Sequence, residues 1–188
     1  MHLADAVVAP EDRYAGALGR VRSALDILRF RAAAVDDAIQ DEGAFPAAAA
    51  IASLAGIATA AAFGLSFAGH VGTSLAYLAG SFLFAGLIHL VAVIGFDAKR
   101  DFLAFYRPFG HTYLAFWIIG IPVIQAFFGW AIWLWQLAAV VFVAERVYGL
   151  DRVRAVALIA GPAVGALVAV AVFNGALAMI APVVGWLL

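Results

Sequence analysis

Charged residues are scarce in this chain of 188 residues, and cysteine is absent altogether. Without cysteine the protein can form no disulfide, no thiolate metal site and no cysteine nucleophile. Only 12% of the residues are charged, and residues 43–96, 108–144 and 155–188 contain no Asp, Glu, Lys or Arg. So few charges cannot cover the surface of an ordinary soluble domain, in which about a quarter of the residues are charged.

Apolar residues take the place of the missing charges and make up 66% of the chain. An ordinary soluble domain is about half apolar, so lipid is the solvent that fits this composition. The sequence therefore predicts an all-α, polytopic membrane helical bundle. We expect two parts, a cytoplasmic N-terminal segment at residues 1–44 and a transmembrane bundle at residues 45–188.

The three uncharged runs predict the number of membrane crossings. A helix needs about 20 apolar residues to cross the hydrocarbon core, so the first two runs each have room for two spans with a short turn. We expect these turns at residues 66–74 and 127–130, and a kink at Pro122, because proline removes a backbone hydrogen bond. The last run fits one span and an apolar tail, with a sixth span as the alternative. The expected spans are 45–65, 72–95, 109–126, 129–147 and 155–174, and the tail is 175–188.

The basic residues are segregated along the chain. All eleven lie before the first expected span, between the second and third, or between the fourth and fifth. The positive-inside rule places such segments in the cytoplasm, and the excess of arginine over lysine is typical of a GC-rich bacterial gene. We therefore expect a bacterial inner-membrane protein with a cytoplasmic N-terminus and a periplasmic C-terminus. The basic residues expected to contact partners are Arg20, Arg22, Arg29, Arg31, Lys99, Arg100, Arg107, Arg152 and Arg154.

Residues 11–42 are expected to form one helix. Apolar side chains from Tyr14 to Ile39 alternate spacings of four and three, which gives a narrow apolar seam. One interpretation is an amphipathic helix that lies on the inner leaflet or on the cytoplasmic face of the bundle. The other is a docking or self-association helix, and the sequence leaves both open.

Ionisable side chains deep in a membrane usually mark a functional site, and this chain has few. None of the expected spans has a charged residue at its middle, so we expect no enzyme and no catalytic residue. His89 is the titratable residue well inside a span. It could bond a neighbouring helix or ligate the metal of a haem or chlorophyll, which makes it the candidate cofactor-binding residue. His70 and His111 are expected at other depths, so no shared metal site is predicted.

Small residues predict close helix packing or self-association. They recur every four residues on the first and fifth expected spans. Glu145, at the end of the fourth span, is expected to form an ion pair at the rim with a neighbouring arginine. The two ridges of small residues are Ala52, Gly56, Ala60 and Gly64 on the first span, and Gly161, Gly165 and Ala169 on the fifth.

Two segments resemble a known family. Residues 99–125, KRDFLAFYRPFGHTYLAFWIIGIPVIQ, resemble the charged lead-in and aromatic-rich third helix of Yip1-domain membrane proteins. Residues 132–162, IWLWQLAAVVFVAERVYGLDRVRAVALIAGP, are similar to the fourth helix of that family and the loop that follows it. The resemblance implies five spans and a non-enzymatic protein, and eukaryotic relatives act with small GTPases in vesicle trafficking. The acidic-aromatic-Gly-Pro motif of those relatives is absent here, so no functional residue is carried over.

Three functions remain open on the sequence. The first is a non-enzymatic scaffold that recruits partners through residues 11–42, 97–107 and 146–154. The second is an accessory subunit of a larger membrane complex, in contact with lipid, quinone or pigment near His89. The third is a small transporter or channel, which the lack of buried polar groups disfavours. The expected partners are the lipid bilayer and other membrane proteins or a second copy of the chain, with no nucleic acid and no required cofactor.

Overall fold

The computed structural model describes residues 14 and 16–165, and within them it contains helices and connecting loops but no β-strand. This confirms the all-α class. A further helix covers residues 152–165. The other elements, in chain order, are α2 (Gly16–Leu28), α3 (Ala32–Gln40), α4 (Ala44–Ala62), α5 (Phe67–Phe96), α6 (Phe102–His111), the 3-10 helix η1 (Thr112–Gly120) and α7 (Pro122–Tyr148).

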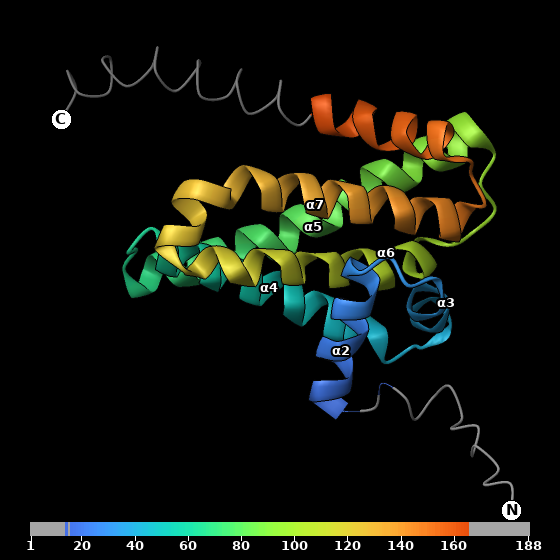
Figure 1. Cartoon of the computed structure of the whole chain (residues 1–188). Helices are drawn as coiled ribbons and strands as arrows, with labels where there is room; N and C mark the ends of the chain where they lie inside the picture. Colours follow the sequence, from blue (N-terminus) through green and yellow to red (C-terminus); the bar gives the residue numbers. More distant parts are fainter. Residues whose placement is uncertain (1–13, 15, 166–188) are drawn as a thin grey trace, which may run out of the picture.

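Three of the described helices, α4, α5 and α7, are long and apolar enough to cross a membrane. They contain 19, 30 and 27 residues. At 1.5 Å per residue even the shortest is about 28 Å long, close to the thickness of the hydrocarbon core. In Figure 1 they run along one common direction as a bundle. The length and apolar composition of these three helices are compatible with a membrane protein.

The segment formed by α6 and η1 is the centre of the bundle. It packs against α4 on one side and against α7 on the other, and it follows the bundle direction in Figure 1. Its aromatic side chains account for several of the largest fully buried groups in the described residues, namely Phe105, Tyr106, Phe109 and Phe116. Burial of such side chains is the main source of apolar stabilisation in the interior.

The chain turns between the third and fourth segments at a different place from the expected one. Helix α7 runs without a break through residues 127–130, so the turn predicted there is wrong. The turn lies at Gly120–Ile121, and Pro122 begins α7 instead of kinking a helix. Proline suits a first helical position because the N–H group it lacks would have no partner there. The third segment is therefore 102–120 and the fourth is 122–148.

The turn between α4 and α5 comes earlier than residues 66–74. Gly64, with φ +62°, ends α4, and the Leu65 N–H donates to the Ala60 carbonyl at 3.0 Å, as in a glycine-terminated helix end. Ser66 then caps α5 by accepting a hydrogen bond from the Gly69 N–H. Serine is a favoured capping residue, and this cap places His70 in the first turn of α5 instead of in a loop.

The single helix expected at residues 11–42 is also wrong, because the described part of this segment is two helices, α2 and α3. Phe30 has φ 58° between them, a left-handed conformation that no helix can continue. The Phe30 ring lies 6.3 Å from that of Trp135 and 5.6 Å from that of Phe142, centroid to centroid. The corner that Phe30 forms between α2 and α3 therefore packs against α7. In Figure 1, α2 lies across the bundle.

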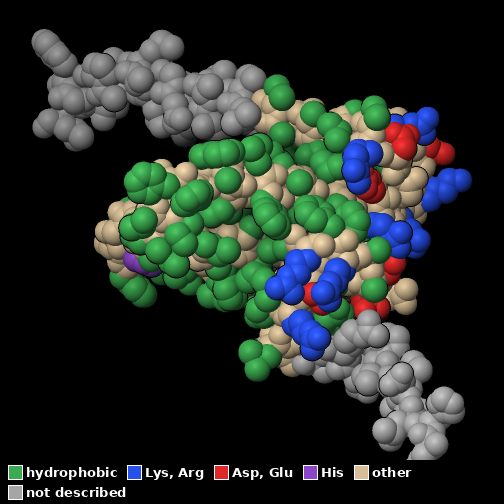
Figure 2. Space-filling view, in the orientation of Figure 1, with side chains coloured by type: hydrophobic (Ala, Val, Ile, Leu, Met, Phe, Trp, Pro, Cys, Tyr) green, Lys and Arg blue, Asp and Glu red, His purple; other side chains and the backbone are tan. Residues whose placement is uncertain are grey.

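The two ends of the bundle differ in charge. The helices alternate in direction, so α2 and α3, residues 97–101 and residues 145–154 meet at one end, where Figure 2 shows the acidic and basic side chains of the visible face. The segments at the other end, residues 60–70 and 118–124, contain no Asp, Glu, Lys or Arg. The helix at residues 152–165 starts from the charged end. The rest of the fifth expected span and the tail at 175–188 lie outside the described residues.

Candidate functional site

Helices α2 and α3 form a cap on the charged end of the bundle, and polar contacts fix it there. An ion pair joins Arg20 of α2 to Asp41, the residue that follows α3. The Arg107 guanidinium of α6 donates a hydrogen bond to the Ile39 carbonyl at 2.7 Å. That carbonyl belongs to the last turn of α3, where backbone oxygens have no partner within the helix.

Helix α7 contributes two further contacts to the cap. Arg146 pairs with Asp36 of α3, and the Trp135 indole N–H donates to the Leu28 carbonyl at the end of α2, at 2.9 Å. Both cap helices are therefore tied to the bundle by side chains that reach backbone carbonyls or acidic groups. The cap is part of the folded core and positions the polar residues between α2 and α3.

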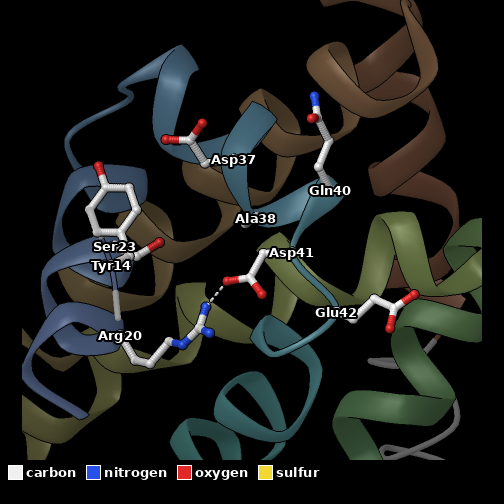
Figure 3. A pocket seen from close by; sticks show the side chains of 8 residues that line it. All are labelled: Tyr14, Arg20, Ser23, Asp37, Ala38, Gln40, Asp41 and Glu42. Carbon is white, nitrogen blue, oxygen red and sulfur yellow. Dashed lines mark hydrogen bonds and ion pairs between the residues drawn. The ribbon is translucent and has the colours of Figure 1, made fainter. Parts of the chain in front are cut away.

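A cavity of about 350 Å³ lies between α2 and α3, and Figure 3 shows the side chains around it. In this view Arg20 and Asp41 point toward one another, whereas Glu42 points away from that pair. We term this space the cap cavity. Its lining residues are Tyr14, Arg20, Ser23, Asp37, Ala38, Gln40, Asp41 and Glu42.

The charges of the cap cavity do not cancel. Arg20 is neutralised by Asp41, whose other oxygen accepts the Gly43 N–H at 2.8 Å. The hydrogen bond from Arg20 lowers the pKa of the Asp41 carboxyl below its ordinary value of 3.8, so Asp41 is ionised at neutral pH. Asp37 and Glu42 remain as two further carboxylates on the lining, and the cavity is acidic as a whole.

Asp37 has an unusual environment. Its Oδ2 atom is buried and accepts no hydrogen bond from the residues that the structure describes. A buried acceptor without a donor costs about 1–3 kcal/mol, and more when it is charged. Ser23, which is 3% exposed, lines the cavity on the α2 side. A cationic donor, an ammonium or guanidinium group, would satisfy Asp37 and match the charge of the cavity.

The described residues contain no group of three or more His, Asp or Glu side chains that could hold a metal ion. The carboxylates of the cap cavity are accordingly not arranged as an oxygen-ligand cage of the kind that hard cations require. Recognition of a single organic cation by an acidic lining is the chemistry that this arrangement supports. Such recognition involves binding and no bond breaking.

The basic residues predicted to contact partners divide into two groups. Arg20 joins the two cap helices through Asp41, and Arg107 holds α3 on the bundle. Partner contacts for the others stay a prediction. These others are exposed at the charged end, and they are Arg22, Arg29, Arg31, Lys99, Arg100, Arg152 and Arg154.

His89, the predicted cofactor ligand, lies close to the end of α5, which stops at Phe96. Its Nδ1 atom is 3.0 Å from the Tyr148 hydroxyl at the end of α7, and its ring lies edge-on to Phe102, 5.9 Å between centroids. The residue is therefore near the charged end instead of at mid-depth. Its observed role is to join α5 to α7, and ligation of a cofactor stays a prediction.

One residue of the site, Asp37, was missed by reasoning from the sequence. Asp36 and Asp37 are adjacent in the sequence, yet Asp36 pairs with Arg146 of α7 whereas Asp37 lines the cap cavity. The signal available in the sequence was a helical-wheel projection of α3, which places Asp36 and Asp37 on different faces of the helix. Outside the cavity, His111 is fully buried, with its Nδ1 2.6 Å from the Arg107 carbonyl oxygen.

The predicted small-residue contacts are partly seen. Gly56 lies directly against α5, because a Cβ atom built there would be 2.5 Å from the Thr73 carbonyl oxygen. Gly64 lies in the turn after α4. At Gly161 and Gly165 a Cβ would meet no atom of the described residues within 4 Å. Ala169 lies outside those residues.

The rim ion pair predicted for Glu145 is confirmed. The Arg152 Nε–H donates to Glu145 Oε1 at 2.8 Å, and this pair connects the end of α7 to the start of the last described helix. Arg152 is largely exposed, so the pair contributes little to stability. It does fix the geometry of the loop at residues 149–151.

No protein-family model matches the chain, and comparison with characterised proteins and with solved structures finds no significant similarity. The likeness of residues 99–125 and 132–162 to Yip1-domain proteins therefore stays a prediction. The function must be argued from the site itself, because fold alone does not define function.

Proposed function

We propose that this protein is a non-enzymatic integral membrane scaffold that recruits a partner through the cap on its charged end. The charged end faces the cytoplasm, and the bundle crosses the membrane five times. The all-helical bundle with three apolar helices supports the membrane setting. The positive-inside rule supports the orientation, since the basic residues gather at one end.

The observation that carries the proposal is the buried Asp37 oxygen that accepts no hydrogen bond within the described chain. A ligand that supplies a cationic donor would satisfy this oxygen. A lysine or arginine side chain of a partner protein has both the charge and the donors. The exposed side of the cap offers the rest of the docking surface, so the partner binds by insertion of one basic side chain into the cap cavity.

The proposal is tested by photocrosslinking in the native membrane. A benzophenone amino acid at Gln40, on the lining of the cavity, should crosslink one discrete partner, and Asp37→Asn should abolish that crosslink. The matched control is Asp151→Asn, which removes an exposed carboxylate of the same end outside the cavity. A crosslink that persists in Asp37→Asn, or one that the control removes equally, would overturn the proposal.

The accessory-subunit and transporter functions remain alternatives without a supporting contact. Pigment or quinone that co-purifies with the wild-type protein but not with His89→Leu would favour the accessory subunit. Because His89 bonds to Tyr148, Tyr148→Phe is the control that removes this bond and keeps the imidazole. Solute flux into proteoliposomes would favour the transporter.

A further inference from the structure

A second hollow lies where the end of α2 meets η1 and α7. Its volume is about 240 Å³, and we term it the corner groove. Leu25 of α2, Ile118 of η1, and Ile132 and Trp135 of α7 contribute its apolar walls, and Arg29 is its charged lining residue. A groove of this kind has room for a narrow apolar chain beside a cation. It is separate from the cap cavity, since the two share no lining residue.

Cations outnumber acids around the groove. The Arg29 and Arg31 guanidinium groups share the carboxylate of Asp26, at 3.9 and 3.2 Å, and Asp26 also accepts the Tyr14 hydroxyl at 3.2 Å. The two arginine side chains are 63% and 60% exposed, whereas Asp26 is buried. Asp26 therefore positions both guanidinium groups at the surface and leaves a net positive charge there.

The exposed stripe of α2 continues this pattern along the helix. Leu18, Arg22, Leu25 and Arg29 follow one another at spacings of four and three, so they lie on one face. Leu18 is 87% exposed and Leu25 is 41% exposed. Exposed leucines that alternate with arginines suit the boundary between acyl chains and phosphates, and basic clusters next to spans attract anionic lipid.

The place of α2 in the molecule agrees with this interpretation. The end of α2 packs against η1 and α7 beside the apolar body of the bundle (Figure 1), and basic side chains gather over it in Figure 2. The Trp135 indole, at the middle of α7 (Pro122–Tyr148), donates its N–H to the Leu28 carbonyl at the end of α2.

We propose that the corner groove binds an anionic phospholipid. One acyl chain lies between Leu25, Ile118 and Trp135, and the phosphate is held by Arg29 and Arg31. Charge complementarity selects the anionic headgroup, and the apolar walls select the chain. The site is thus a specific lipid site, in contrast to the general lipid contact made by the rest of the apolar surface.

The headgroup contact is tested by native mass spectrometry of the full chain in detergent, titrated with phosphatidylglycerol or phosphatidylcholine. Wild-type protein should retain phosphatidylglycerol at least about tenfold more tightly than phosphatidylcholine. Arg29→Gln with Arg31→Gln should remove that preference. The matched control is Arg152→Gln with Arg154→Gln, two exposed arginines at the same end, which should keep it. Equal retention of both lipids by the wild-type protein, or equal loss in both double variants, would overturn the site.

The groove is tested separately with Ile118→Trp, which fills it. Ile118 is 51% exposed, so the larger ring can be accommodated without disturbing the core, and circular dichroism checks the fold. We expect loss of the phosphatidylglycerol adduct, whereas Leu83→Trp on the exposed face of α5 should retain it. Full competition by inorganic phosphate, or a second copy of the chain in place of lipid, would show that no acyl chain occupies the groove.

Discussion

Gly56 lies where α4 crosses α5, and the absence of a side chain there sets the distance between the two helices. Beside it the Ser53 and Ser74 hydroxyls are 2.6 Å apart, and the Thr59 hydroxyl donates to Tyr77 at 3.0 Å. These hydrogen bonds require the close approach that glycine permits. A single small residue thus determines whether a row of polar contacts between the helices can form.

We expect Gly56→Ala to destabilise the protein by about 1–3 kcal/mol, because the new Cβ would lie against backbone atoms of α5 that cannot move alone. Thermal unfolding in detergent, followed by circular dichroism, measures the effect. Gly86→Ala is the matched control, since a Cβ there meets nothing within 4 Å and alanine favours the helix. A Gly56→Ala protein as stable as Gly86→Ala would contradict the close contact.

The Arg20–Asp41 ion pair makes the contact between α2 and the end of α3 dependent on pH. The pKa of Asp41 is lower in the folded protein than its ordinary 3.8. The stabilisation is therefore fully present well above the ordinary pKa of 3.8 and is lost as the pH falls through the lowered pKa, where the carboxylate becomes protonated. We expect the difference in melting temperature between the wild type and Arg20→Gln to shrink between pH 5 and pH 2.

Scanning fluorimetry over that pH range measures the difference. Arg100→Gln, which alters an exposed arginine that forms no ion pair with the residues that the structure describes, is the control and should follow the wild type at every pH. If the Arg20→Gln difference stays constant down to pH 2, Asp41 is not the group that Arg20 stabilises.

At the scale of elements, the α6–η1 segment shows how a segment of few residues can extend along the length of the bundle. It has 10 α-helical and 9 3-10 helical residues. A 3-10 helix rises about 2.0 Å per residue, so the segment is about 33 Å long, against about 28 Å for an α-helix throughout. Gly110 of α6 and Gly120 of η1 also lie against Ala48 and Ala58 of α4, so both halves of the segment pack close to α4.

The corner between α2 and α3 depends on Phe30. Its left-handed backbone is unfavourable for a residue with a side chain, by about 1–2 kcal/mol, and its ring contacts with Trp135 and Phe142 offset that cost. We expect Phe30→Ala to lower the protection of α2 and α3 against hydrogen exchange. Phe30→Gly loses the same ring contacts but relieves the backbone, so it should be the milder of the two.

Hydrogen exchange followed by mass spectrometry measures this order, with α5 as the internal reference. Equal protection of the cap in both variants would show that the backbone conformation of Phe30 carries no cost. Protection at the wild-type level in both would show that the ring contacts do not hold the corner.

At the scale of the whole molecule, the segregation of charge defines two different ends. The helices alternate in direction, so every described segment that carries basic residues reaches the same end. Each basic residue at the membrane surface favours the cytoplasmic side. The sum of these small preferences supports the orientation that we propose.

We expect this orientation to appear in cysteine labelling, since the natural chain has no cysteine. Ser66→Cys, in the turn between α4 and α5, should react with a membrane-impermeant maleimide on intact cells. Lys99→Cys, between α5 and α6, should react only after the membrane is permeabilised. Reaction of Lys99→Cys on intact cells with protection of Ser66→Cys would show the reverse orientation.

The sequence by itself determined the helical class, the apolar body and the gathering of basic residues, because composition and the length of uncharged runs act locally along the chain. It also predicted the Glu145 ion pair. It misplaced the turn at residues 120–122, since Pro122 was taken as a kink although proline suits the first position of a helix equally well.

Only the tertiary structure decided the corner at Phe30, the burial of His111 and the place of Asp37. The periodicity from Tyr14 to Ile39 fits one long helix as well as two short ones, and the difference comes from rings on α7, more than a hundred residues away along the chain. The cap cavity and the corner groove likewise exist only where α2 meets other elements. Local preferences specify helices, whereas sites between helices depend on contacts that no local pattern contains.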